Sequence, residues 1–77
     1  MSRKKITSAR DYVRGSAGYH GHLDGGTDEL NGKLGDPRER FIKWHPSMPE
    51  SDWPAYKSAY IAGFDASKQL GAILRRT

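Results

Sequence analysis

The last third of the chain has the clearest alternation of apolar and polar positions. Residues 52–75 contain no proline after Pro54, and at 100° per residue their large apolar side chains fall within one sector roughly 120° wide. The side chains in this sector are those of Trp53, Tyr56, Tyr60, Phe64, Leu70 and Leu74. The pattern predicts a long amphipathic helix over 52–75, capped by Ser51 or Asp52, with Pro54 tolerated in its first turn.

The same segment carries a row of small residues at spacing four, formed by Ala55, Ala59, Gly63, Ser67 and Gly71. Glycine inside a helix costs about 1 kcal/mol relative to alanine, so the row indicates that another backbone packs closely against it. Internal packing on the shorter helices is one interpretation. The other is a partner chain or a homodimer, because an apolar stripe about 35 Å long exceeds what two short helices cover. The partner-binding residues we predict are Trp53, Tyr56, Tyr60, Gly63 and Phe64.

A shorter helix is predicted over 37–44. Asp36-Pro37 provides an acceptor at the N-cap and a proline at the first helical position. Phe41 and Trp44 are three residues apart and share a face. Pro46 ends the helix, because the residue before a proline is pushed out of the helical region.

The N-terminal half shows weaker patterning. We expect a flexible basic arm over 1–7 and a short helix over 8–14. Residues 15–35 hold seven of the nine glycines and predict a Gly-rich loop, since glycine loses more backbone entropy on ordering than any other residue. The whole chain, 1–77, is therefore predicted to be one small, mainly α domain with a short N-terminal helix, a Gly-rich loop, a short middle helix and a long C-terminal helix.

Length and composition limit the classes of protein to which the chain can belong. A chain of 77 residues buries only about 60% of the surface that it exposes when unfolded. Because it has no cysteine, it cannot form a disulfide or a thiolate metal site. No apolar run reaches the roughly 18 residues of a membrane span, and the basic start lacks the apolar stretch of a signal peptide. We expect a cytoplasmic protein without a membrane partner, too small for most enzyme scaffolds.

The positive charge is concentrated at one end of the chain. Thirteen Lys and Arg against nine Asp and Glu give a net charge of +4; residues 1–14 hold five of these basic residues and one acidic residue, and 15–77 hold eight of each. A basic arm is typical of a nucleic-acid binder, although it is also an ordinary solubilising terminus. The residues that would contact RNA or DNA are Arg3, Lys4, Lys5, Arg10, Arg14, Arg38, Arg40 and Lys43. In the second interpretation, the last three are a solvated face around a core containing Phe41 and Trp44.

Histidines provide the only candidate metal site. His20-Gly21-His22-Leu23-Asp24 has the His-x-His-x-Asp order of metallo-β-lactamase-like hydrolases, but that fold needs a chain several times longer. A smaller site from His20, His22, Asp24 and His45 would require the loop to bend around the ion. We expect solvated imidazoles, no metal and no cofactor. Because the sequence also lacks a nucleophile elbow or a Cys–His pair, we predict that the protein is not an enzyme.

Two segments carry a family resemblance: YVRGSAG at residues 12–18, and Trp53 followed by YIAGF at residues 60–64. This layout resembles the ribosome modulation factors, small basic two-helix proteins that bind the ribosome, and the resemblance implies a nucleoprotein partner. The chain departs from that family in having no Cys-Pro-Tyr segment and a longer segment between the two matches. Its general form is also similar to small bacteriophage-encoded proteins that modulate host machinery.

These observations favour a small non-enzymatic binding protein, of phage type, that docks on a larger protein or nucleoprotein through its C-terminal helix and modulates or inhibits it. The alternative is direct binding of RNA or DNA through the basic arm and Arg38, Arg40 and Lys43.

Overall fold

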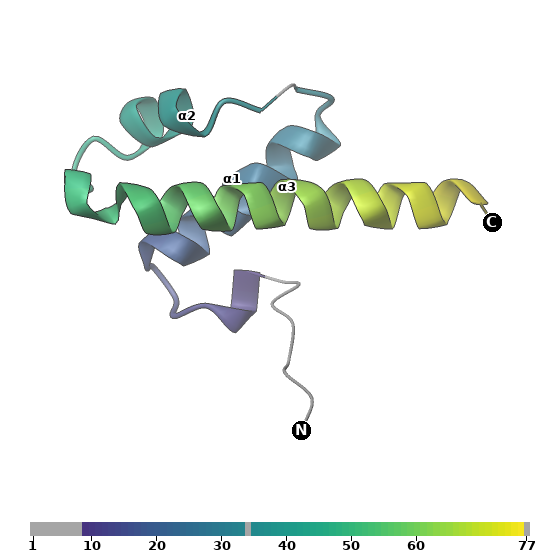
Figure 1. Ribbon diagram of the computed structural model, residues 1–77, viewed down its shortest axis with the longest axis horizontal. Coiled ribbons are helices and arrows are strands. Elements are labelled where there is room, and N and C mark those ends of the chain that lie inside the picture. The colour runs from purple at the N-terminus through teal and green to yellow at the C-terminus, as the bar shows by residue number, and fades with distance from the viewer. Residues whose placement is uncertain (1–8, 34, 77) are drawn as a thin grey trace.

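The computed structural model describes residues 9–33 and 35–76, and side chains up to residue 73. The elements in chain order are the 3-10 helix η1 (Ala9–Asp11), α1 (Ala17–Leu30), α2 (Pro37–Trp44), the 3-10 helix η2 (Glu50–Asp52) and α3 (Trp53–Arg76). No strand occurs among these described residues, so the prediction of a small, mainly α domain is confirmed. Figure 1 shows α3 running along the molecule, with α1 crossing α3 obliquely and α2 above the N-terminal half of α3. The C-terminal end of α3 extends beyond the other helices.

The predicted loop over 15–35 is wrong, because most of it forms α1. Ser16 caps the helix, and its hydroxyl oxygen accepts a hydrogen bond of 3.2 Å from the backbone N–H of Tyr19. The buried positions of α1 are Gly18, Gly21, His22, Gly25 and Asp28. Their spacing is that of one helical face. This face is made mainly of glycines, so it does not register as an apolar pattern.

The end of α1 is a Schellman motif centred on Gly32. Its N–H donates to the carbonyl of Glu29 at 3.0 Å, and the N–H of Lys33 donates to the carbonyl of Asp28 at 2.9 Å. Gly32 has a φ of +73°, a left-handed conformation that glycine adopts without steric cost. The glycine composition of this segment therefore both packs the helix and ends it.

Glycines allow the backbones of α1 and α3 to touch where the two helices cross. A Cβ atom placed on Gly21 or Gly25 would overlap the carbonyl oxygen of Tyr56 or Tyr60, respectively. On α3, a Cβ at Gly63 would overlap the carbonyl oxygen of His22 and lie 3.0 Å from its Cα. The prediction that a backbone packs closely on Gly63 is confirmed, and the backbone belongs to α1 of the same chain.

The other two predicted helices are confirmed. Asp36 caps α2 by accepting from the backbone N–H of Glu39 at 3.1 Å, and Pro37 is the first helical residue. The long helix begins at Trp53, one residue after the predicted position. The expected short N-terminal helix is represented by η1, and the predicted arm over 1–7 lies outside the described residues.

The core lies between α2 and α3. The large buried side chains are those of Phe41, Tyr56 and Tyr60, with Ala17, Met48, Trp53 and Phe64 packed around them. The centre of the Phe41 ring lies 5.3 Å from that of the Trp53 ring and 5.2 Å from that of the Tyr56 ring. Aromatic side chains of α3 thus pack against α2, while the small residues of α3 pack against α1.

Candidate functional site

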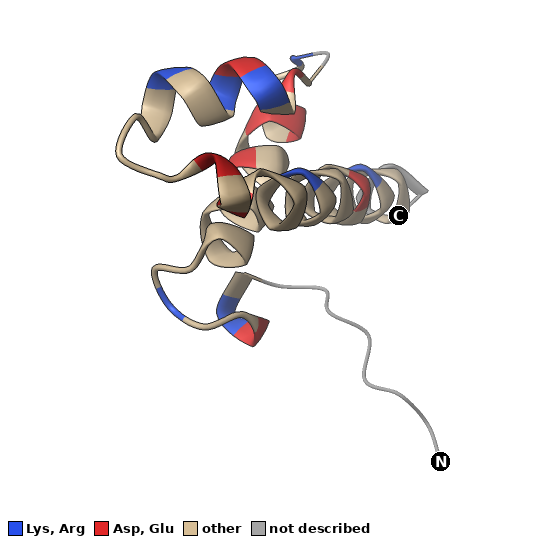
Figure 2. Cartoon of the chain, turned by 60° about the vertical axis from the view of Figure 1, so that its left-hand side comes forward, with Lys and Arg blue, Asp and Glu red and all other residues tan. Residues whose placement is uncertain are grey.

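A cluster of polar side chains joins the three helices. On α1, Asp24 accepts hydrogen bonds from the Tyr56 hydroxyl at 2.6 Å and pairs with His45 Nε2 at 2.8 Å. One turn later, Asp28 accepts a short hydrogen bond from the Tyr60 hydroxyl. Figure 2 shows the acidic positions of α1 on the part of that helix beside α2.

Arg40 lies between these two carboxylates. Its guanidinium nitrogens are 3.5 Å from Asp24 Oδ1 and 3.8 Å from Asp28 Oδ1, and its side chain is only 15% exposed. Asp28 is buried and Asp24 is half-buried, and two carboxylates so close together require a nearby cation, since an unpaired charge away from water is very costly. The role of Arg40 in a solvated or nucleic-acid-binding face is therefore corrected: its charge compensates two carboxylates of the same chain.

The tyrosine hydroxyls of this cluster stay protonated. Burial, together with the hydrogen bond to Asp24, raises the pKa of Tyr56 far above its usual value of 10.0. The pKa of Tyr60 is raised in the same way by burial and by Asp28. Both tyrosines therefore act as hydrogen-bond donors to carboxylates, and the arrangement holds α1 against α3.

The histidines are distributed over different surroundings because the segment is helical. His22 is buried with its ring 5.6 Å from that of Tyr12, whereas His20 is half-buried with its ring 4.9 Å from that of His45. Two positions apart on a helix is a rotation of about 200°, which separates the two side chains of a His-x-His pair. Within the part of the chain that the structure describes, no three His, Cys, Asp or Glu side chains are placed to hold a metal ion.

Three of the predicted partner-binding residues lie in the core. Tyr56 and Tyr60 are almost completely buried, and Gly63 is covered by α1. The partner role predicted for these three is corrected to internal packing, because α1 occupies the face that the row of small residues creates. Trp53 and Phe64 are partly buried at the edge of the core.

The predicted nucleic-acid-binding residues are separated by the fold. Arg38 forms an ion pair of 2.7 Å with Glu50, and its guanidinium lies 4.8 Å from the centre of the Trp53 ring. Lys43 is exposed on α2. Arg10 and Arg14 are exposed near the start of α1. The structure does not describe Arg3, Lys4 and Lys5.

An apolar groove lies beside the crossing of α1 and α3. It has a volume of about 340 Å³ and is lined by Ala9, His22, Leu23, Gly26, Thr27, Leu30, Gly63, Ala66, Ser67 and Leu70. Two large apolar side chains of the groove are open to solvent: Leu30 is 78% exposed and Leu70 is 56% exposed. One helical turn after Leu70, Ile73 is also exposed. The site combines a floor of small residues with a rim of exposed leucines.

Sequence reasoning found only part of this groove. Leu70 belongs to the predicted apolar sector of the long helix, but Leu23 and Leu30 lie in the segment that was expected to be a loop. Their spacing of seven is the available signal, because it places them on one face of a helix.

Comparison with known proteins gives no family: no protein-family model, curated protein or solved structure matches the chain. Among the described helices, none is both long and apolar enough to cross a membrane.

Proposed function

We propose that this is a non-enzymatic binding protein that docks on a larger protein by accepting one of that protein's amphipathic helices in the groove between α1 and α3. The observation that supports the proposal is the exposure of Leu30 and Leu70 on either side of a floor of small residues. Contiguous apolar surface of this kind is typical of protein-interaction sites.

The shape of the groove favours a helix over an extended peptide. Gly26 and Ala66 line it and leave room for a backbone to approach closely. Leucines from both helices, Leu23 and Leu30 of α1 and Leu70 of α3, can contact the i, i+3, i+4 and i+7 side chains of a helix in the groove. No strand edge is present among the described residues, which disfavours pairing of a partner strand.

The titratable groups of the polar cluster are used within the chain. Asp24 and Asp28 accept hydrogen bonds from tyrosines, and Arg40 lies between them. Because these groups are paired with one another, we propose a binding role for the protein and not a catalytic one.

The experiment compares tagged full-length chains as baits in a nuclease-treated lysate of the source cells. Leu30→Asp and Leu70→Asp place a charge on each rim of the groove. Trp44→Asp on α2 is the matched control, because the 64% exposure of Trp44 lies between those of the two leucines. We expect the same protein to be retained by the wild type and by Trp44→Asp and to be lost with both groove variants. Retention by all four chains would contradict the proposal.

Analytical sedimentation of the purified chain tests whether a second copy of the chain, and not a larger protein, occupies the groove. A wild-type monomer is expected. A wild-type dimer that Leu70→Asp converts into a monomer would show that a second copy fills the groove, and would overturn docking on a larger protein.

A further inference from the structure

We infer that the helix accepted by the groove carries one uncharged polar side chain, a hydroxyl or a carboxamide, on its apolar face, and that this side chain hydrogen-bonds to the imidazole of His22. This specificity rests on the docking function proposed above and adds the chemistry of the segment that docks. His22 belongs to the buried face of α1 and lines the groove. A single polar contact at this point fixes the register of an otherwise apolar helix.

His22 is enclosed without a hydrogen bond for one of its ring nitrogens. The residue is 7% exposed, and its Nε2 atom is shielded from solvent and has no hydrogen-bond partner among the described residues. A buried polar atom left without a partner is destabilising. A docked helix that supplies the missing hydrogen bond therefore binds more tightly than a helix with a wholly apolar face.

The other polar side chains that line the groove do not need a partner in this way. Ser67 Oγ donates a hydrogen bond of 2.9 Å to Glu29 Oε1, and Thr27 is exposed to water. His22 is therefore the position at which the groove selects for a polar residue.

Gly26 provides the space for the side chain of the docked helix. It lies four residues after His22, so the two are neighbours on the surface of α1, and both line the groove. Among described residues outside the helix itself, only the carbonyl oxygen of Gly63 would lie within 4 Å of a Cβ placed on Gly26, at 3.7 Å. A partner side chain over Gly26 lies beside the imidazole, and rotation of the ring about χ2 turns Nε2 toward it.

The partner's polar side chain is uncharged because the imidazole is neutral at pH 7. Burial lowers the pKa of His22 below its ordinary value of 6.5, and a neutral imidazole has one nitrogen that donates and one that accepts. A hydroxyl or a carboxamide can take either role. A carboxylate or an ammonium group would lose its hydration in the groove without an opposite charge in return, which is costly.

The test is a selection from a displayed library of amphipathic helices about twenty residues long, with the positions of the apolar face randomised. The full-length wild type is the bait, and Leu30→Asp is the bait for counter-selection, so the retained helices are those that need the groove. We expect these helices to share one Ser, Thr, Asn or Gln within the apolar face. Groove-dependent helices with a wholly apolar face would overturn the inference and leave docking in the groove standing. A library from which no helix depends on Leu30 would overturn both.

A double-mutant cycle with one selected helix tests His22 itself. Replacing the shared polar residue of the helix by alanine should weaken binding to the wild type about tenfold in fluorescence anisotropy, and should have little effect on binding to His22→Phe. Ser67→Ala is the matched control, because Ser67 also lines the groove but is already paired, and the loss should persist in this variant. An equal loss in His22→Phe and in the wild type would refute the hydrogen bond.

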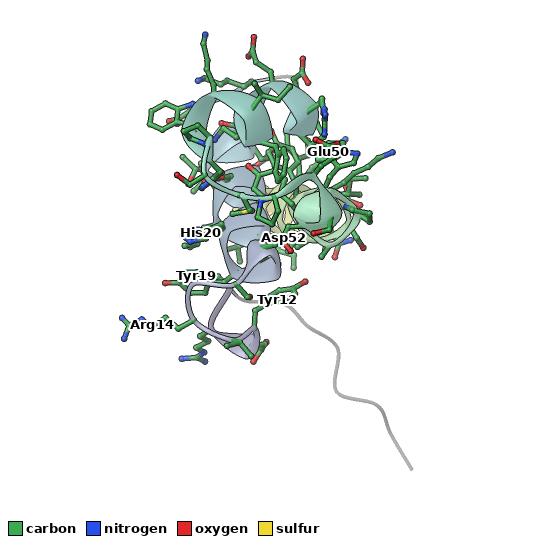
Figure 3. The ribbon with its side chains drawn as sticks, turned by 90° about the vertical axis from the view of Figure 1, so that its left-hand side faces the viewer. Tyr12, Arg14, Tyr19, His20, Glu50 and Asp52 are labelled. Atoms are coloured by element: carbon green, nitrogen blue, oxygen red, sulfur yellow. The ribbon has the colours of Figure 1, made fainter. Side chains whose placement is uncertain are left out.

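NMR of the histidine ring nitrogens gives a readout that needs no variant of the protein. The Nε2 resonance of His22 should shift when the selected helix binds, and should shift much less with the alanine version of that helix. His20 is the internal control, because Figure 3 shows it on the opposite side of α1 from Tyr12, whose ring centre lies 5.6 Å from that of His22. Equal shifts of the His22 Nε2 resonance with the two helices would contradict the inference.

Discussion

At the scale of single residues, Gly63 decides how closely the two long helices approach. In an exposed helix, Gly→Ala stabilises by up to about 1 kcal/mol. The Cβ of an alanine at Gly63 would instead overlap the backbone of His22. We expect Gly63→Ala to lower the free energy of unfolding by roughly 1 to 3 kcal/mol or more through overpacking, as measured by urea denaturation.

Gly26→Ala is the matched control for this change. An added Cβ at Gly26 would lie 3.7 Å from the carbonyl oxygen of Gly63, an ordinary van der Waals contact. This variant should be as stable as the wild type or more stable. If Gly63→Ala stabilised the chain as Gly26→Ala does, the close crossing described above would be incorrect.

Arg40 is the residue whose loss should affect the polar cluster most. In Arg40→Ala the carboxylates of Asp24 and Asp28 lose their shared cation, and breaking a buried ion pair in this way costs about 3 to 5 kcal/mol. Thermal unfolding followed by circular dichroism should show a large fall in melting temperature. Lys43→Ala, on the exposed side of α2, should change the free energy of unfolding by less than about 0.5 kcal/mol; equal effects of the two variants would contradict the assigned role of Arg40.

The free energy of unfolding should depend on pH because of His22. Burial lowers its pKa below the ordinary value of 6.5, and nearby Asp11 partly offsets the effect. The neutral ring therefore contributes its full stabilisation above pH 6.5, and this contribution is lost as pH falls from 6.5 toward the lower pKa of the folded state.

His22→Phe keeps a ring at this position and removes the titration. The free energy of unfolding of the variant should vary less between pH 7 and pH 5 than that of the wild type. An identical pH dependence in the two proteins would show that His22 does not cause it.

At the scale of elements, the three main helices differ in how well sequence predicts them. The long helix α3 and the short helix α2 follow from apolar spacing, capping residues and proline positions. The helix α1 does not, because its buried face is formed by Gly18, Gly21 and Gly25. Glycine contributes no apolar surface and has a low helix propensity, so its role appears only when α3 is placed against it.

The N-cap of α1 can be tested separately from its packing. Ser16→Ala removes the acceptor for the backbone N–H of Tyr19 and should lower the free energy of unfolding by about 1 kcal/mol. The matched control is Ser58→Ala on the exposed side of α3, which should change stability by less than about 0.5 kcal/mol. Denaturant titrations that gave no difference between the two variants would exclude a stabilising cap.

At the scale of the whole molecule, the candidate docking surface arises from contacts between helices. Sequence reasoning identified Leu70 and the basic arginines. For Tyr56, Tyr60 and Gly63 it predicted partner binding and left internal packing open as the other interpretation. Those residues pack within the same chain, and the groove edged by Leu30 and Leu70 is an apolar surface that remains exposed. Such a groove cannot be located from one helix alone, because its two rims come from different helices.

Docking through this groove is tested most directly by photo-crosslinking in cells. A photoreactive phenylalanine analogue replaces Leu70 in one full-length chain and Trp44, which is similarly exposed, in another. We predict one crosslinked protein from position 70, absent from position 44 and lost when Leu30→Asp is added. Equal crosslinking from both positions, or crosslinking from position 70 that persists with Leu30→Asp, would contradict docking in the groove.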